Sequence, residues 1–223
     1  MRVVSLVPSV TETLLAWDVV PVAVTRFCEH PELPAVGGTK DPDVAAIATL
    51  RPDLVVVNDE ENRKQDADAL LAHGLAVHVV HIAAVADVAA ALTELADRLG
   101  VSSPDPAPLP APVHLGLRAF VPIWRRPWMT LDATTYGSSV LARLGVANVF
   151  AEAGSRYPEV TLAEAAERRP DVVLAPTEPY PFAERHEEEL AQVAPVRFVD
   201  GKDLFWWGWR TPTALRRLGE ALA

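Results

Sequence analysis

The segment Val44-Ala-Ala-Ile-Ala-Thr-Leu-Arg-Pro-Asp-Leu-Val-Val56 recurs as Leu162-Ala-Glu-Ala-Ala-Glu-Arg-Arg-Pro-Asp-Val-Val-Leu174, at a constant offset of 118 residues. In each copy an alanine-rich stretch runs into Arg-Pro-Asp, and apolar, mostly β-branched residues follow. Proline ends a helix and biases the residue before it away from the α conformation. Each copy therefore predicts a helix, a sharp stop and a buried strand, and the pair predicts a chain built as two similar halves.

The same alternation extends outward through the first hundred residues. Short, continuous apolar runs are typical of parallel strands that are buried on both faces, and the periodic stretches between them favour helices. The predicted strands are Val3–Val7, Val20–Thr25, Leu54–Asn58 and Ala76–Ile82, and the predicted helices are Ser9–Trp17, Asp43–Leu50, Asn62–His73 and Val85–Leu99.

A proline-rich stretch separates the two halves. Residues 102–112 contain five prolines in eleven positions, which favours an extended chain over a helix. We therefore predict an N-terminal lobe over residues 1–101, a linker over 102–112 and a C-terminal lobe over 113–223. The predicted elements of the second lobe are strands at Val113–Val121, Val172–Ala175 and Val196–Asp200, and helices near Gly137–Leu144, Leu162–Arg168, Ala183–Val193 and Thr213–Leu222.

These elements predict an α/β protein with two Rossmann-like three-layer lobes and mainly parallel sheets. In open α/β sheets ligands bind outside the carboxyl ends of the strands, so we expect a ligand cleft between the lobes.

Composition excludes several classes of function. The 223 residues are 50% hydrophobic, enough for sizeable cores, and 20 Lys+Arg against 30 Asp+Glu give a net charge of −10. That sign disfavours nucleic acid and anionic membrane surfaces as partners. No apolar run is long enough for membrane insertion, and the start lacks a signal-peptide pattern. We expect a monomer that is cytoplasmic as the sequence stands, or extracytoplasmic if the true start lies upstream.

The loops carry aromatic residues instead of catalytic motifs. No phosphate-binding loop, nucleophile elbow or paired-histidine zinc helix occurs, so nucleotide hydrolysis and serine-type acyl transfer have little support. Trp124, Trp206, Trp207 and Trp209 follow predicted strands, where exposed rings suit a large flat ligand. The alternative is that these rings pack the core. Neighbouring side chains of an extended segment point to opposite faces, so we expect one ring of Trp206 and Trp207 to meet the ligand and the other to anchor the loop.

Cys28 and His30 form a compact pair of potential metal ligands. A thiolate and an imidazole suit zinc, cobalt or another transition metal, and Glu60 and Glu61 could join them if the loops converge. The alternative is a half-buried thiol and a loop histidine with no metal. Cys28 is the chain's single cysteine, so no intrachain disulfide can form.

Three segments resemble the helical-backbone metal receptor family, the substrate-binding proteins of class III ABC importers, and among them the cobalamin-binding type. These segments are Arg2–Leu15, Val36–Val44 and Leu50–Val57, and Tyr157–Leu162 and Asp171–Ala175 extend the resemblance into the second half. The family binds a chelated metal between two lobes and passes it to a membrane permease without chemistry. It joins its lobes by one long helix, whose place is taken here by the proline-rich stretch.

The resemblance implies a set of functional residues. The implied ligand-binding residues are Pro8, Ser9, Thr11, Asn58, Glu60, Trp124, Arg125, Tyr180, Trp206 and Trp207. Glu61 and Glu184 match the acidic residues that dock to the permease of the ABC transporter. The resemblance implies no intrinsic cofactor, and a transport ligand that is cobalamin, another corrinoid, or a different metal chelate such as haem or a siderophore.

Three functional hypotheses follow. The first is a non-catalytic binding protein for a metal chelate, with a corrinoid as the favoured ligand and an ABC importer as partner. The second is a cytoplasmic protein of the same fold that handles a metal or corrinoid for an enzyme pathway. The third is a metal-dependent enzyme that uses Cys28, His30 and Glu60.

Overall fold

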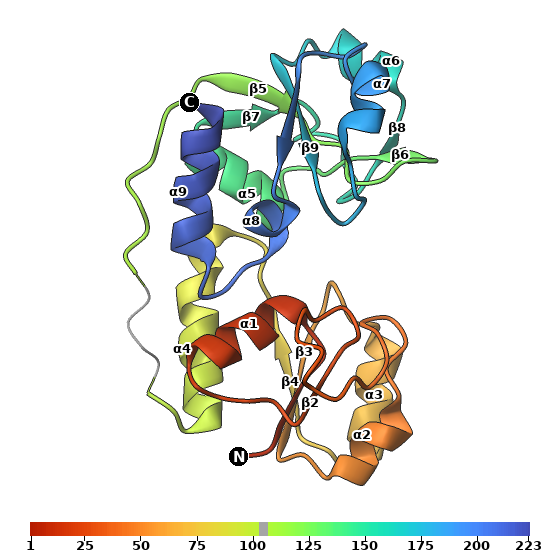
Figure 1. Cartoon of the computed structure of the whole chain (residues 1–223), viewed down its shortest axis with the longest axis vertical. Helices are drawn as coiled ribbons and strands as arrows, with labels where there is room; N and C mark the ends of the chain where they lie inside the picture. Colours follow the sequence, from red (N-terminus) through yellow and green to blue (C-terminus); the bar gives the residue numbers. More distant parts are fainter. Residues whose placement is uncertain (103–106) are drawn as a thin grey trace. The chain divides into compact units, whose positions relative to one another are not determined.

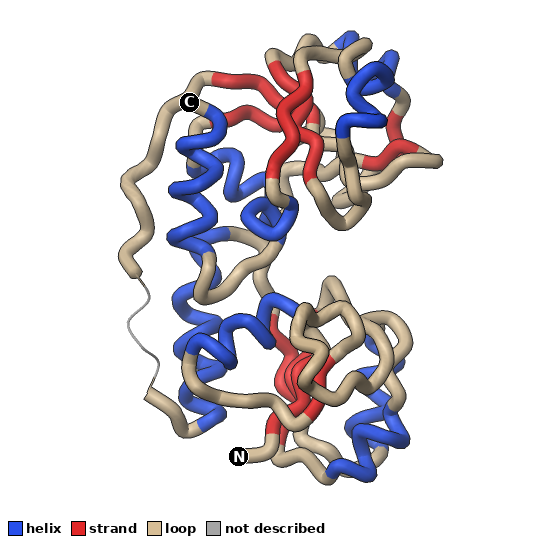
Figure 2. The backbone as a smooth tube through the Cα atoms, in the orientation of Figure 1, coloured by secondary structure: helices blue, strands red, loops and turns tan. Residues whose placement is uncertain are grey.

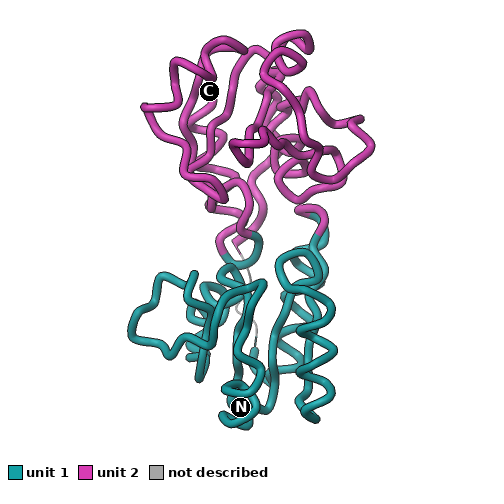
Figure 3. The backbone as a smooth tube through the Cα atoms, turned by 90° about the vertical axis from the view of Figure 1, so that its right-hand side faces the viewer, with its two compact units in different colours: residues 1–82, 86–106, 207–209 teal, residues 83–85, 107–206, 210–223 magenta. Residues whose placement is uncertain are grey.

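The computed structural model describes residues 1–102 and 107–223 and divides into two compact units (Figures 1 and 3). Unit 1 comprises residues 1–82, 86–106 and 207–209, and unit 2 comprises residues 83–85, 107–206 and 210–223. The short segment 207–209 thus belongs to unit 1, although the chain on both sides of it belongs to unit 2.

Unit 1 is built on a four-stranded parallel sheet. Its strands are β1 (Val3–Ser5), β2 (Ala23–Val24), β3 (Leu54–Asn58) and β4 (Val77–Val80), in the order β2-β1-β3-β4. The helices of this half are α1 (Pro8–Ala16), α2 (Val44–Leu50), α3 (Lys64–Ala72) and α4 (Val88–Leu99), the last preceded by a 3₁₀ turn, η1 (Val85–Asp87). In Figure 1, α2 and α3 lie on one side of the sheet and α1 and α4 on the other. Ile47 of α2 and Leu70 of α3 pack against Val55 and Val57 in the core.

Unit 2 repeats this design with a second four-stranded parallel sheet. Its strands are β5 (Leu117–Phe120), β7 (Val146–Asn148), β9 (Val172–Pro176) and β10 (Val196–Val199), in the order β10-β9-β5-β7. The helices are α5 (Tyr136–Arg143), α6 (Leu162–Glu167), η2 (Glu184–His186), α7 (Glu187–Leu190), α8 (Gly201–Phe205) and α9 (Thr211–Leu222). A small antiparallel pair, β6 (Trp128–Met129) and β8 (Glu159–Val160), lies beside this sheet (Figure 2).

The predicted repeat is confirmed by the strand order. The first copy forms α2 and β3, and β3 lies between β1 and β4. The second copy forms α6 and β9, and β9 lies between β5 and β10. The predicted α/β class with mainly parallel sheets is therefore also confirmed.

The first Arg-Pro-Asp sequence forms a clasp between a helix end and the next strand. Arg51 takes the left-handed conformation, with φ of 46°, and ends α2. The Asp53 carboxylate accepts a hydrogen bond from the Arg2 backbone N–H at 2.6 Å. The Arg2 guanidinium in turn donates to the Leu50 carbonyl at 2.9 Å. The motif thus ties the end of α2 to the residue before β1.

The second Arg-Pro-Asp sequence forms the same clasp in unit 2. Arg169 has φ of 51°. The Asp171 carboxylate accepts from the Arg118 backbone N–H at 2.8 Å, and the Arg118 guanidinium donates to the Arg168 carbonyl at 2.8 Å. The motif that repeats in the sequence is therefore a structural device that aligns helix and sheet in each unit.

Replacing Asp171 with alanine should lower the free energy of unfolding by about 1 kcal/mol, because it removes a charge-assisted hydrogen bond at an exposed site. Asp53→Ala should have a similar effect through the matching clasp of unit 1. Urea unfolding of both variants measures this, with Asp97→Ala, an exposed change on α4, as the control. An Asp171→Ala variant as stable as the control would contradict the role of the clasp.

Two expected elements differ from the structure, and several elements of unit 2 were not expected. β5 begins at Leu117 instead of Val113, because the backbone N–H groups of residues 113, 115 and 116 bond to carbonyls at the end of α5. The expected helix Ala183–Val193 is divided into η2 and α7. The sequence did not predict α8, whose start Asp200 caps by accepting from the Lys202 N–H. It also did not predict the short strands β6, β7 and β8.

Residues 103–106 of the predicted linker lie outside the described residues, and residues 107–116 carry neither helix nor strand. Within the described ranges 1–102 and 107–223, no helix is long and apolar enough to cross a membrane.

His78 of β4 is buried under α4 with 4% of its surface exposed. Burial and the charge of Arg98 lower its pKa, although Glu94, with its Oε1 3.8 Å from Nδ1, acts in the opposite direction. At a pH between the lowered pKa of the folded chain and the ordinary histidine pKa of about 6.5, the unfolded chain therefore binds a proton that the folded chain does not. This group stabilises the fold above that pH, and its contribution is lost as the pH falls toward the lowered folded pKa.

We expect unfolding in urea to show this dependence between pH 7.5 and 5.5. The wild-type chain should lose more stability on acidification than a His78→Gln variant does. His73→Gln, a change at an exposed histidine of the same half, should follow the wild type. Parallel pH curves for His78→Gln and the wild type would contradict the assignment.

Candidate functional site

The predicted ligand residues Pro8, Ser9 and Thr11 form the buried first turn of α1, directly after β1. Val7 precedes the helix and provides no side-chain cap, and Pro8 has no N–H to satisfy. The Thr11 hydroxyl lies 2.9 Å from Ser5 Oγ and 3.2 Å from the Val7 carbonyl oxygen. Hydrogen bonding therefore holds the start of α1 against the end of β1.

Cys28 and His30 have neighbours of their own in the loop after β2. The Cys28 thiol lies 3.3 Å from Thr11 Oγ1 and 3.6 Å from Thr25 Oγ1, and His30 Nδ1 lies 3.0 Å from Glu32 Oε1. Across residues 1–102 and 107–223, no three His, Cys, Asp or Glu side chains gather in a metal-binding arrangement. These contacts fit the packing alternative for both residues.

The loop after β3 carries Asn58, Glu60 and Glu61. Asn58 is buried, and its side-chain oxygen accepts from the backbone N–H groups of Glu60 and Glu61, both at 3.0 Å. Its amide nitrogen donates to the Val80 carbonyl of β4 at 3.0 Å. The two glutamates are half-buried. Asn58 therefore shapes the loop, and the glutamates are the residues that the loop presents.

In unit 2, the structure brings Trp124, Arg125 and Tyr180 together. Trp124 is 44% exposed and meets Tyr180 edge to face, with ring centroids 5.7 Å apart. Arg125 Nε donates to Glu189 Oε2 at 2.8 Å, a contact that raises the pKa of Arg125, and the Tyr180 hydroxyl is a second partner of the guanidinium. These side chains follow β5 and β9, two neighbouring parallel strands, at the sheet edge where α/β proteins bind ligands.

A second layer of rings supports Tyr180. Its ring centroid lies 4.7 Å from that of Phe182 and 5.5 Å from that of His186, and Phe182 stacks on Trp128 at 6.0 Å. His186 is 5% exposed, and its pKa is lowered chiefly by burial. Its Nδ1 accepts from the Ala183 N–H at 3.1 Å, which leaves Nε2 to face the Tyr180 hydroxyl at 3.5 Å. Phe182 and His186 are not among the predicted ligand-binding residues, because no recognised motif connects them to Tyr180.

The two adjacent tryptophans differ in exposure. Trp207 is 4% exposed, whereas Trp206 is half-buried. The Lys202 ammonium lies 5.0 Å and the Arg210 guanidinium 5.5 Å from the Trp206 ring centroid. Asp203 holds Arg210 at 3.3 Å, and burial raises the pKa of that carboxyl. Of the two rings, Trp206 is the one placed where a ligand could reach it.

The predicted docking residues occupy different settings. Glu184 is exposed at the start of η2, and Glu61 is half-buried in the loop after β3. Their role in docking stays a prediction.

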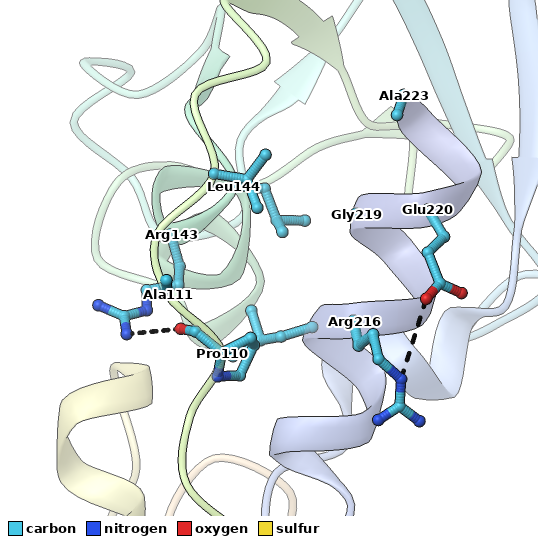
Figure 4. A pocket seen from close by; sticks show the side chains of 10 residues that line it. Pro110, Ala111, Arg143, Leu144, Arg216, Gly219, Glu220 and Ala223 are labelled. Carbon is cyan, nitrogen blue, oxygen red and sulfur yellow. Dashed lines mark hydrogen bonds and ion pairs between the residues drawn. The ribbon is translucent and has the colours of Figure 1, made fainter.

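A groove of about 260 Å³ lies elsewhere in unit 2, between residues 110–113, the end of α5 and α9 (Figure 4). Arg143 donates across it to the Pro110 carbonyl at 2.9 Å, and Arg216 faces Glu220 at 4.0 Å. None of the predicted ligand residues lines this groove. The candidate site therefore consists of the strand-end loops.

Comparison with known proteins finds relatives by sequence and by structure. No family model matches the chain. The vitamin B12-binding protein of Salmonella paratyphi A is 26% identical over 180 residues, which cover 72% of this chain and 66% of that protein. The Salmonella typhimurium protein of the same name is 25% identical over the same share of each chain. The match thus spans about two thirds of the length of these curated relatives.

Solved structures of periplasmic binding proteins share the fold. The vitamin B12-binding protein BtuF of Vibrio cholerae superposes with a TM-score of 0.78 at 20% identity, covering 99% of this chain and 96% of that one. A periplasmic heme-binding protein of Pseudomonas aeruginosa gives 0.79 at 19% identity, covering 99% and 92%. Both of these solved structures are of proteins named as periplasmic, so they do not support the expectation that this chain is cytoplasmic. The sequence similarity to vitamin B12-binding proteins and the fold shared with periplasmic binding proteins both support the resemblance to the class III substrate-binding proteins of ABC importers.

Proposed function

We propose that this chain is a non-catalytic binding protein for a metal chelate, with a corrinoid such as cobalamin as its first candidate ligand. The cluster of Trp124, Arg125 and Tyr180 carries the proposal. An exposed indole held edge to face on a tyrosine offers a rigid apolar surface, and rigid rings bind flat ligands with little loss of conformational entropy. The names of the sequence relatives point to vitamin B12.

The proposal extends to partner and location. We propose that the chain works outside the cytoplasm, as its periplasmic structural neighbours do, and delivers its ligand to an ABC permease. Glu184, exposed on unit 2, and Glu61, on the unit 1 loop, would meet basic residues of that permease. Opposite charges of this kind favour rapid and specific encounter.

A second candidate ligand is a ferric porphyrin. Tyr phenolate is an established ligand of haem iron, and Tyr180 meets the exposed Trp124 ring edge to face at the strand-end loops. Several structural neighbours are named as heme-binding proteins. Tyr180 would bind the metal in this case, whereas a corrinoid would use mainly the surface of Trp124.

Titration of the purified chain with cyanocobalamin, hemin and a ferric siderophore tests both candidates. Tryptophan emission and the ligand's absorption bands report binding. Trp124→Ala should weaken binding of the preferred chelate by about 2 kcal/mol, or about 30-fold, as expected for an aromatic hot spot. Phe198→Ala, a change at an exposed ring of β10, is the matched control and should leave binding unchanged.

Tyr180→Phe separates the two candidates. It should abolish the iron–phenolate band with hemin while leaving cobalamin affinity within about threefold, because only haem iron uses the hydroxyl. If no chelate binds, or if Trp124→Ala binds as tightly as Phe198→Ala, the proposed function is wrong.

A further inference from the structure

Asn62 joins three segments of unit 1 through one buried side chain. It is 5% exposed, and its Oδ1 accepts from the Asn58 backbone N–H at 2.8 Å. Its Nδ2 donates to the Leu6 carbonyl at 3.1 Å and to the Thr39 carbonyl at 2.9 Å. The acceptor and both donors of the amide are therefore used. The end of β1, the loop around Thr39 and the end of β3 meet at this residue.

Further hydrogen bonds hold the loop residues between Asn58 and Asn62. Asn58 Oδ1 accepts from Glu60 and Glu61, as described above, and Asn62 N–H donates to the Asn58 carbonyl at 2.9 Å. The exposed Lys40 ammonium donates to the Glu60 carbonyl at 2.7 Å. Asp59 Oδ2 lies 2.6 Å from His81 Nδ1. Asn62 lies at the buried base of this loop, and Lys40 and His81 hold its outer side.

We propose that Asn62 is the positioning residue of this ligand loop, which holds residues 59–61 in their binding conformation before the ligand arrives. This inference rests on the proposed function, and on the ligand-binding role that the family resemblance implies for Asn58 and Glu60. When only a fraction of the free molecules has the loop in its binding conformation, the apparent affinity is the intrinsic affinity multiplied by that fraction. Asn62 contributes by making that fraction large, without itself touching the ligand.

The competing explanation is that Asn62 only stabilises the fold. Asn148 of β7 offers a matched control, because its side chain also makes three hydrogen bonds. Its Nδ2 donates to the Leu131 carbonyl at 2.7 Å and to Ser138 Oγ at 2.9 Å, and its Oδ1 accepts from the Phe150 N–H at 2.9 Å. Asn148 is outside the ligand-binding set, so its loss should affect stability alone.

The test compares Asn62→Ala and Asn148→Ala with the wild type. Three quantities are measured: the melting temperature, the affinity for cyanocobalamin and hemin, and the hydrogen exchange of the Glu60 and Glu61 backbone amides. We expect both variants to lose stability to a similar extent. Asn62→Ala alone should bind about tenfold more weakly and exchange these two amides faster than the wild type without ligand.

Lys40→Met provides a second variant that removes the exposed contact to the same loop and leaves the core intact. It should change exchange and affinity in the same direction by a smaller factor, which keeps the test decisive if Asn62→Ala does not fold. Unchanged loop exchange, or equal affinity losses in Asn62→Ala and Asn148→Ala, would overturn the positioning role. A wild-type chain that binds neither chelate would instead refute the proposed function, and the exchange data would still report whether Asn62 orders the loop.

Discussion

Gly208→Ala should lower the free energy of unfolding by about 3 kcal/mol, because it combines backbone strain with steric overlap. Gly208 has φ of 124°, a conformation that residues with a side chain rarely adopt. A Cβ at this position would overlap Thr13 Oγ1 and lie 3.5 Å from the Ser9 carbonyl oxygen. The Thr13 hydroxyl cannot easily move, because it donates to the Ser9 carbonyl at 2.9 Å and accepts from the Trp209 N–H at 3.2 Å.

Gly154→Ala is the control for this prediction. Gly154 also has a positive φ, of 73°, but a Cβ there would meet nothing within 4 Å. This variant should lose about 1 kcal/mol from the backbone conformation alone. Adding Thr13→Ala to Gly208→Ala should recover part of the loss by removing the overlapping hydroxyl. Equal urea midpoints for Gly208→Ala and Gly154→Ala would show that steric overlap with α1 contributes nothing.

Trp207→Ala should lower the free energy of unfolding by about 4 kcal/mol, because it removes a large buried ring and leaves a cavity. The ring is 4% exposed and belongs to the segment Trp207–Trp209, which is part of unit 1. Trp124→Ala, at a ring that is 44% exposed, should cost less than about 1 kcal/mol. Thermal and urea unfolding give both values.

Ligand titration completes the comparison of the two rings. Trp124→Ala should lose affinity for the chelate while keeping its stability. The main effect of Trp207→Ala should instead be a loss of stability. A Trp207→Ala variant that unfolds like the wild type but no longer binds chelates would reverse the two roles.

The predicted site was a set of residues from separate loops, and the structure connects only part of it. Tyr180 lies more than fifty residues after Trp124 and Arg125 in the sequence, yet the three meet because β5 and β9 are neighbouring parallel strands. The repeat and the strand–helix alternation were enough to expect such a meeting at the carboxyl ends. The supporting rings of Phe182 and His186 were not predicted, because their contacts depend on the fold of the loop after β9.

Asn62 shows the same limit in unit 1. It marked the start of an expected helix, whereas its side chain bonds to Leu6, 56 residues earlier. Cys28 and His30 are two residues apart in a pattern that suits a metal, but in the structure each has its own partners, Thr11 and Glu32. Spacing along the chain does not determine which groups a loop places side by side.

The elements and the repeat are properties of the sequence itself, because hydrophobic periodicity, Arg-Pro-Asp stops and β-branched runs act over a few residues. Alternation of buried and exposed side chains also predicted that Trp206 and Trp207 would differ. Tertiary structure alone decided which ring is buried. Trp209 donates to Thr13, 196 residues away, and this contact holds the Trp207–Trp209 segment on α1. Burial depends on partners that are distant in sequence, so no local pattern could assign it.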